Sequence, residues 1–127
     1  EYCGMARTKE GLKKAAPIIA ELRQHFWNNV KVPGKSNDMN PELEKAGRLA
    51  DFLELAELMV QDAKHREESC GGHFREESQT DENEALRNDD DFAFSSAWEH
   101  TDVGQEAKLH KEELQFDNVK LTQRSYK

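Results

Sequence analysis

The segment of the chain that is richest in reactive side chains is Glu68–Glu77, which reads E-S-C-G-G-H-F-R-E-E. Imidazole and thiolate groups are common protein ligands of zinc, so His65, Cys70 and His73 are candidate ligands. Cys3 could supply a fourth ligand. The spacing H-x4-C-x2-H matches no established zinc motif, so we assign no metal ligand and keep zinc binding as an alternative.

Cys70 also invites an interpretation as a redox-active or nucleophilic thiol. It follows the end of a long predicted helix, where the negative end of the helix dipole disfavours a thiolate. A structural interpretation is favoured instead, because Gly71 and Gly72 let the backbone turn sharply. His73 and Arg75 would then donate hydrogen bonds to carbonyls or carboxylates of a neighbouring element.

The other candidates for chemistry are weaker. The sequence holds no phosphate-binding loop, no dinucleotide-binding glycine pattern and no set of nucleophile, base and orienting group. Charged residues make up 35% of the chain, so adjacent carboxylates such as Glu67 and Glu68 are expected on a solvated face. Isolated histidines and tryptophans fit surface positions or packing: His25, His100, His110, Trp27 and Trp98. We predict no catalytic or cofactor-binding residue in this chain.

Two long helices must position the segment. Residues 8–30 form the first, with Thr8 as its N-cap, and Pro17 predicts a kink or a break inside it. Residues 41–68 form the second, because Asn40 is a strong N-cap and Pro41 suits the first helical position. The first helix carries one apolar stripe: Leu12, Ala15, Ile19, Leu22 and Phe26.

The second helix carries two apolar stripes. One consists of Ala46, Leu49, Leu53, Ala56, Val60 and Ala63, and the other of Phe52, Leu55 and Met59. A helix with one antiparallel partner needs only one stripe, so this helix should be the centre of a bundle. We expect a further helix upstream that is cut short at residue 1. Its absence would leave a groove that favours dimerisation of this fragment.

The rest of the chain predicts a hairpin. Ser69 to Gly72 end the second helix, and residues 76–91 form an acidic loop. The alternation at residues 92–98 predicts a strand, with residues 114–121 as its partner and residues 102–108 as a polar turn. A lone hairpin is marginally stable in water, so it should dock on the helices.

The predicted fold is mainly α. It is a three-helix-bundle-type (spectrin-repeat-like) domain with a truncated first helix, a C-terminal β-hairpin and an extended tail. Its parts are a helical bundle over residues 1–75, an acidic loop over residues 76–91, and a docked hairpin and tail over residues 92–127.

The composition of the chain excludes several classes of function. The chain has 127 residues, enough for one domain, and a formal net charge of -8, which argues against nucleic-acid binding. Residues 76–91 carry eight acidic side chains and one basic, so this loop accounts for -7 of that charge. Two cysteines are too few for a disulfide framework and indicate a reducing compartment. No apolar run approaches the ~18 residues of a membrane span.

Four segments of the chain carry a resemblance to a known family. The segment Glu68–Glu77 resembles the E-S-R-G-x-H-x-R-E-D stretch in the flavoprotein subunit of succinate dehydrogenase and fumarate reductase. The sequence at Gly4–Leu12 is similar to that family's R-x-x-E-G-L motif, and Asn40–Leu43 to its N-x-E-L helix start. The ending at Gln123–Lys127 resembles the family's basic, Ser/Thr and Tyr terminus. The resemblance covers the whole chain and identifies it with the family's C-terminal domain.

The chain departs from the family at Cys70, where most members have Arg, and at Gly72, where many have Ala. The stretch Ser78–His110 is longer and more acidic than in many members and resembles the Bacteroides type. Those members pair with an iron–sulfur subunit and a haem-bearing membrane anchor.

The resemblance implies a non-catalytic domain that packs against the FAD-binding domain of its own chain, while the iron–sulfur clusters belong to a partner subunit. It implies a cytoplasmic location, peripheral to the membrane through the complex. The implied contact and turn residues near the packing surface are Ser69, Gly71, Gly72, His73 and Arg75. The alternatives are the equivalent domain of an L-aspartate oxidase or adenylylsulfate reductase, and a free-standing helical metal-binding or adaptor domain.

Overall fold

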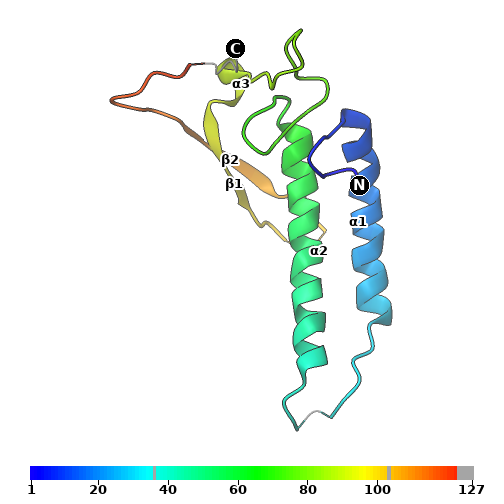
Figure 1. Cartoon of the computed structure of the whole chain (residues 1–127). Coiled ribbons are helices and arrows are strands. Elements are labelled where there is room, and N and C mark those ends of the chain that lie inside the picture. The colour runs from blue at the N-terminus through cyan, green and yellow to red at the C-terminus, as the bar shows by residue number, and fades with distance from the viewer. Residues whose placement is uncertain (36, 103, 123–127) are drawn as a thin grey trace.

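The computed structural model describes residues 1–35, 37–102 and 104–122 (Figure 1). Two long helices lie side by side and are joined at one end by a loop, while a hairpin lies on the other side of the second helix. The elements are α1 (Lys9–Asn29), α2 (Pro41–His65), α3 (Asp89–Phe92), β1 (Phe94–Glu99) and β2 (Lys108–Glu113). This confirms the predicted class, a mainly helical domain with an antiparallel hairpin. The predicted third helix would precede residue 1, so it stays a prediction, as does the division into three parts.

Both helices begin where their caps predict. The Thr8 hydroxyl accepts a hydrogen bond from the backbone N–H of Gly11 at 3.0 Å. The Asn40 side chain accepts from the N–H of Glu42 at 3.1 Å and of Leu43 at 3.3 Å. These bonds satisfy N–H groups that have no partner within the helix.

Two details of the helices differ from the prediction. The prediction of a break at Pro17 is wrong, because α1 runs without interruption from Lys9 to Asn29, whereas the alternative, a kink, stays a prediction. A proline removes only one helical hydrogen bond, and Pro17 is exposed, so water can solvate the freed carbonyl. The second helix ends at His65 rather than residue 68, because Arg66 has the extended conformation of a C-cap.

The interface between α1 and α2 is small. The guanidinium of Arg23 bridges the helices through ion pairs with Glu54 at 2.8 Å and Glu57 at 2.6 Å. Only the first two members of the α1 stripe, Leu12 and Ala15, are buried. The apolar side chains buried among the described residues are Leu12, Ala15, Ala50, Val60, Ala63 and Phe94.

The hairpin is confirmed, but its second strand is not where the sequence predicted it. β1 pairs antiparallel with β2, with Phe94 opposite Glu113 and Glu99 opposite Lys108. The prediction of a strand over residues 114–121 is therefore wrong. β2 is mostly polar and exposed, so it lacks the alternation that marks a half-buried strand. Backbone pairing and cross-strand charges hold it, as in the ion pair of Lys108 Nζ with Glu99 Oε2 at 3.8 Å.

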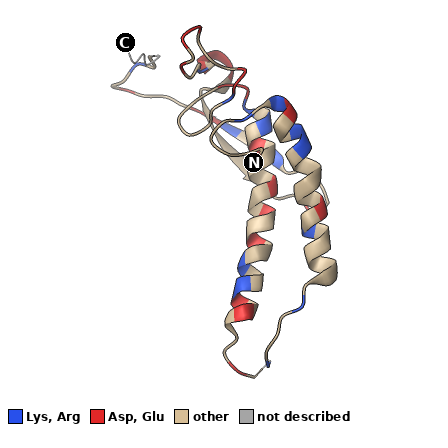
Figure 2. Cartoon of the chain, turned by 45° about the vertical axis from the view of Figure 1, so that its right-hand side comes forward, with Lys and Arg blue, Asp and Glu red and all other residues tan. Residues whose placement is uncertain are grey.

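The acidic loop has more local structure than expected. Its backbone turns at Asn83, which has a φ of 62°, and Gln79 bridges to Ala85. The last residues form α3, so the predicted strand over residues 92–98 begins two residues later than predicted. Acidic residues are frequent in α3 and in the loop before it, whereas the long helices contain residues of both charges (Figure 2). None of the helices in the described parts of the chain has both the length and the apolar character needed to cross a membrane.

Candidate functional site

The segment after α2 folds into a tight turn. The backbone of Cys70 and that of His73 exchange two hydrogen bonds, of 2.8 and 3.0 Å. Gly71 has a φ of 58°, in the left-handed region that favours glycine, so this position carries the turn. A Cβ added at Gly72 would meet no atom within 4 Å, so packing does not require a glycine there.

Ser69 and Arg75 close this turn. The Ser69 hydroxyl accepts a hydrogen bond from the Arg75 backbone N–H at 2.8 Å and donates one to the Arg75 carbonyl at 3.1 Å. Ser69 is completely buried and Arg75 is 2% exposed. Buried polar groups are costly unless they are paired, so the reciprocal pair stabilises the two ends of the turn against each other.

The Arg75 side chain caps the C-terminus of α2. Its Nη1 donates to the carbonyl of Ala63 at 3.1 Å, and its Nε donates to Glu77 Oε2 at 3.1 Å. The last carbonyls of a helix have no partner within it, and a cation there complements the helix dipole. Arg75 therefore fixes the direction in which the chain leaves α2.

His73 caps the same helix end and reaches the N-terminal segment. Its Nε2 lies 2.8 Å from the carbonyl of Arg66, and its Nδ1 lies 2.8 Å from Arg7 Nη1. A carbonyl can only accept and a guanidinium can only donate, so Nε2 carries the proton and Nδ1 is an acceptor. Burial lowers the pKa of His73, and the nearby positive charges of Arg7, Arg75 and Arg66 lower it further, so the ring is held neutral.

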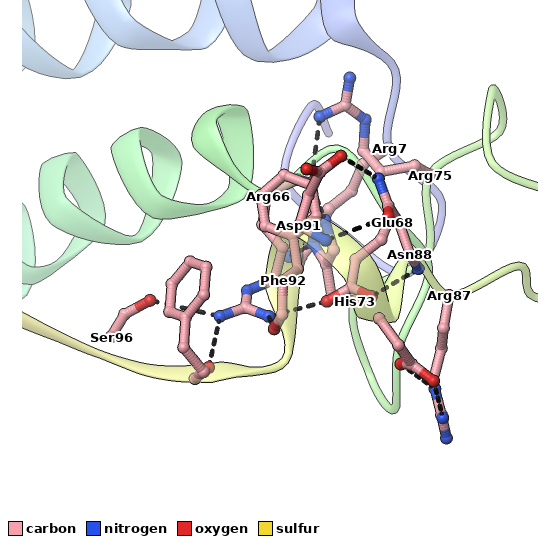
Figure 3. Close-up of polar contacts among 12 residues, drawn as sticks. Arg7, Arg66, Glu68, His73, Arg75, Arg87, Asn88, Asp91, Phe92 and Ser96 are labelled. Atoms are coloured by element: carbon pink, nitrogen blue, oxygen red, sulfur yellow. Dashed lines mark hydrogen bonds and ion pairs between the residues drawn. The ribbon is translucent and has the colours of Figure 1, made fainter. Parts of the chain in front are cut away.

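Arg7 joins the two ends of the helical region, as Figure 3 shows. Its backbone N–H donates to the carbonyl of Phe74 at 3.0 Å, and its carbonyl accepts from the N–H of Glu76 at 2.9 Å. The R-x-x-E-G-L segment and the E-S-C-G-G-H-F-R segment are thus neighbours in space. No pattern in the sequence predicted this contact.

Arg66 ties the hairpin to the same place. It donates to Glu68 Oε1 at 2.7 Å and to the carbonyl oxygens of Phe92 and Phe94, both at 3.1 Å. Its guanidinium also lies over the Phe94 ring, 5.0 Å from the centroid. Glu68 is 2% exposed, and its Oε2 accepts from the backbone N–H of Asn88 at 3.0 Å.

The predicted contact and turn residues lie together at the end of α2: Ser69, Gly71, Gly72, His73 and Arg75. Arg7, Arg66 and Glu68 join them there and were not predicted. Opposite charges two residues apart were a usable signal for the pair of Arg66 and Glu68, but their partners in the hairpin and the acidic loop lie 20 or more residues away in the sequence. No sequence pattern near Arg7 predicted its contacts with the turn. We call the set Arg7, Arg66, Glu68, Ser69, His73, Arg75 and Glu77 the helix-end cluster.

The helix-end cluster holds separate segments of this chain together. Its cations donate to carbonyls, carboxylates or the imidazole of the same chain. Among the described residues, no group of three or more His, Cys, Asp or Glu side chains could hold a metal ion. His65, considered as a zinc ligand, lies edge-on to Phe92 and Trp98 at ring distances of 6.0 and 6.2 Å. The motif at Gln123–Lys127 lies outside the described residues.

Replacing the buried capping cation should weaken the domain strongly. We expect Arg75→Gln to lower the free energy of unfolding by roughly 2–4 kcal/mol, because it removes charged hydrogen bonds from a buried site. The matched control is Arg87→Gln, which removes the partly exposed pair with Asp89 and should cost less than about 1 kcal/mol. Urea unfolding of the variants measures both values. Equal losses in the two variants would contradict the capping role.

The neutral state of His73 predicts a pH dependence. Its ordinary pKa is 6.5 and its folded pKa is lower, so below pH 6.5 the unfolded chain binds a proton that the folded chain does not. Stability is therefore full above pH 6.5 and falls as the pH drops toward the folded pKa. Urea unfolding at about pH 7.5 and about pH 5.5 should show a smaller loss for His73→Gln than for the parent chain. An equal loss in both would show that His73 does not titrate in this way.

The comparisons with known proteins agree on one family. The family model described as "Fumarate reductase flavoprotein C-term" matches residues 1–126. The fumarate reductase flavoprotein subunit of a Serratia species is 36% identical over 75 residues, which are 59% of this chain and 12% of that protein. The succinate dehydrogenase flavoprotein subunit of Rickettsia bellii is 36% identical over 76 residues, 60% of this chain and 13% of that protein.

Solved structures extend the similarity to nearly the whole chain. The FrdA chain of the Escherichia coli quinol fumarate reductase superimposes with a TM-score of 0.79 and 28% identity, covering 97% of this chain and 20% of that one. A quinol–fumarate reductase with menaquinol gives a TM-score of 0.75, covering 93% of this chain and 19% of that one. The chain thus spans about an eighth of the curated relatives it matches. It belongs to the family of C-terminal domains of succinate dehydrogenase and fumarate reductase flavoprotein subunits.

Proposed function

We propose that this chain is a non-catalytic bracing domain of an FAD-dependent flavoprotein subunit that interconverts succinate and fumarate. The observation that carries the proposal is the similarity to FrdA over 97% of the chain, at a TM-score of 0.79. The described part of the chain superimposes on one-fifth of that protein. The remaining four-fifths are available to hold the flavin and the substrate.

The residues of this chain do not fit an FAD site. The sequence has no dinucleotide-binding glycine pattern, and the cationic groups of the helix-end cluster that could meet a pyrophosphate are bonded to the chain itself. FAD therefore belongs to the upstream part of the flavoprotein in this proposal. There it supplies hydride exchange with a C4 dicarboxylate, and the electrons pass to an iron–sulfur subunit.

The bracing role uses the rigidity of the helix-end cluster. The neutral His73, the half-buried Arg66 and the buried Ser69 fix the N-terminal segment, the end of α2 and the hairpin to one another. A domain joined in this way presents its outer faces at fixed angles. Those faces would meet the FAD-binding domain and the iron–sulfur partner of a complex that is attached to the cytoplasmic membrane through its anchor.

The proposal predicts a clear difference between the chain and the flavoprotein that contains it. The purified 127-residue chain should show no flavin absorbance and no fumarate reduction with a reduced dye, whereas the complete flavoprotein should show both. A yellow chain, or turnover by the chain alone, would contradict the proposal.

Zinc analysis of the same sample tests the adaptor alternative. We expect less than one bound zinc per chain, and no change in Cys70→Ser. One equivalent of zinc that is lost in Cys70→Ser would favour a free-standing metal-binding domain and count against the bracing role.

A further inference from the structure

One contact between the segment before α1 and the turn after α2 depends on a group that titrates near neutral pH. Arg7 Nη1 donates to His73 Nδ1 at 2.8 Å, and both side chains are half-buried. The two residues are 66 positions apart, so the contact joins distant parts of the chain. A ring nitrogen that accepts from a guanidinium carries no proton, so this contact exists only while the imidazole is neutral.

Arg7 differs from the other cations around the ring. The charged groups that face His73 come from three parts of the chain: Arg7 before α1, Arg66 at the end of α2 and Arg75 in the turn. Arg66 and Arg75 each have a carboxylate partner, at 2.7 and 3.1 Å. The Arg7 side chain bonds His73 and the carbonyl of Gly4, at 2.9 Å, and it pairs with no carboxylate of the described residues. A proton on the ring would place two positive charges side by side with no anion between them.

Protonation of His73 would remove one of its two contacts and keep the other. Nε2 donates to the carbonyl of Arg66 at 2.8 Å, and a protonated ring still donates there. Nδ1 would change from an acceptor to a donor, and it would then face a donor of Arg7. An arginine stays charged throughout, so Arg75 keeps its bond to the carbonyl of Ala63. The cap of α2 is therefore retained when the contact with Arg7 is lost.

The start of α1 gives the segment a fixed end. Lys9 donates its backbone N–H to Glu77 Oε1 at 2.6 Å and its ammonium group to Glu67 Oε1 at 2.8 Å. The hydrogen bond from Lys9 lowers the pKa of Glu67. Burial raises the pKa of Glu77, but hydrogen bonds from the Lys9 backbone and from Arg75 outweigh burial and leave that pKa below its ordinary 4.5. Both carboxylates thus stay charged in mild acid, and Lys9 stays attached.

We propose that the pair of Arg7 and His73 is a pH-sensitive latch. Near neutral pH it holds the segment before α1, residues 2–7, against the turn after α2, and mild acid releases this segment while the helix end stays capped. Two backbone bonds cross the latch and would open with it, from Arg7 N–H to the Phe74 carbonyl and from Glu76 N–H to the Arg7 carbonyl. The latch is separate from the proposed bracing function, because all of its contacts lie within this chain.

The size of the effect follows from the uptake of a proton on opening. Burial lowers the pKa of His73 in the closed latch, and the three guanidinium groups lower it further, so opening returns the pKa toward its ordinary 6.5. The latch has its full strength above pH 6.5 and weakens as the pH falls toward the folded pKa. An open ring with that ordinary pKa is mostly neutral at about pH 7.5 and about nine-tenths protonated at about pH 5.5. The opening equilibrium therefore rises by up to about tenfold between these two values.

Hydrogen exchange of the complete flavoprotein tests the latch, with mass spectrometry of overlapping peptides at about pH 7.5 and about pH 5.5. The reporters are the amides of Arg7 and Glu76. The reference is the amide of Ala63, a buried residue in the last turn of α2. Each rate is corrected for the intrinsic effect of pH on amide exchange. At the higher pH the reporters and the reference should exchange through the same opening, and at the lower pH the reporters should exchange about three- to tenfold faster than the reference.

This comparison needs no variant, and two results would overturn the inference. In the first, the reporters gain nothing on the Ala63 amide at the lower pH, so protonation does not release the segment. In the second, all three amides accelerate equally, so acid opens the whole helix end and not a latch.

Substitutions then identify the titrating pair. His73→Gln keeps a side chain that can accept from Arg7 but does not titrate, so the acid response should fall below about twofold. Arg7→Gln removes the facing charge, and its amide oxygen can accept from a protonated ring, so it should have the same effect. The matched control is His65→Gln, which should keep the full response, because His65 lies edge-on to Phe92 and Trp98 at the same helix end. An acid response that persists in His73→Gln, or that disappears in His65→Gln, would overturn the inference.

Discussion

The carbonyl groups that α2 leaves unpaired at its C-terminus are the constraint on which the rest of the structure depends. A helix end that is buried must find donors from elsewhere. Arg75 supplies one to the carbonyl of Ala63, and His73 supplies one to the carbonyl of Arg66. Both donors come from the turn that follows the helix, so the turn and the helix end hold each other in place.

Three other parts of the chain are attached to this one place. The N-terminal segment is attached through Arg7, the hairpin through Arg66, and the acidic loop through the contact of Glu68 with the backbone of Asn88. Several guanidinium groups lie close together there, and the histidine among them is held neutral. The neutral ring can accept from Arg7 and donate to Arg66 at once, which a protonated ring could not do.

The sequence predicted the helices and the turn well because their signals are local. N-caps, a proline at a first helical position and a glycine in a left-handed turn each act through neighbouring residues. The prediction for β2 failed because Lys108–Glu113 is held by backbone pairing and cross-strand charges rather than by an apolar face. The role of Arg7 was missed for a related reason, since its partners in the turn after α2 lie 66 or more residues away in the sequence.

The central claim is that the helix-end cluster and α2 form one cooperative unit. Native-state hydrogen exchange tests this most directly, through the amides of Arg7, Arg75 and Glu76, which bond to Phe74, Ser69 and Arg7. The account predicts that these amides exchange with the same opening free energy as the buried amides of α2. Added urea should lower the opening free energies of both groups of amides in parallel. If the three amides exchange through a separate local opening whose free energy is well below that of the α2 amides, the account is contradicted.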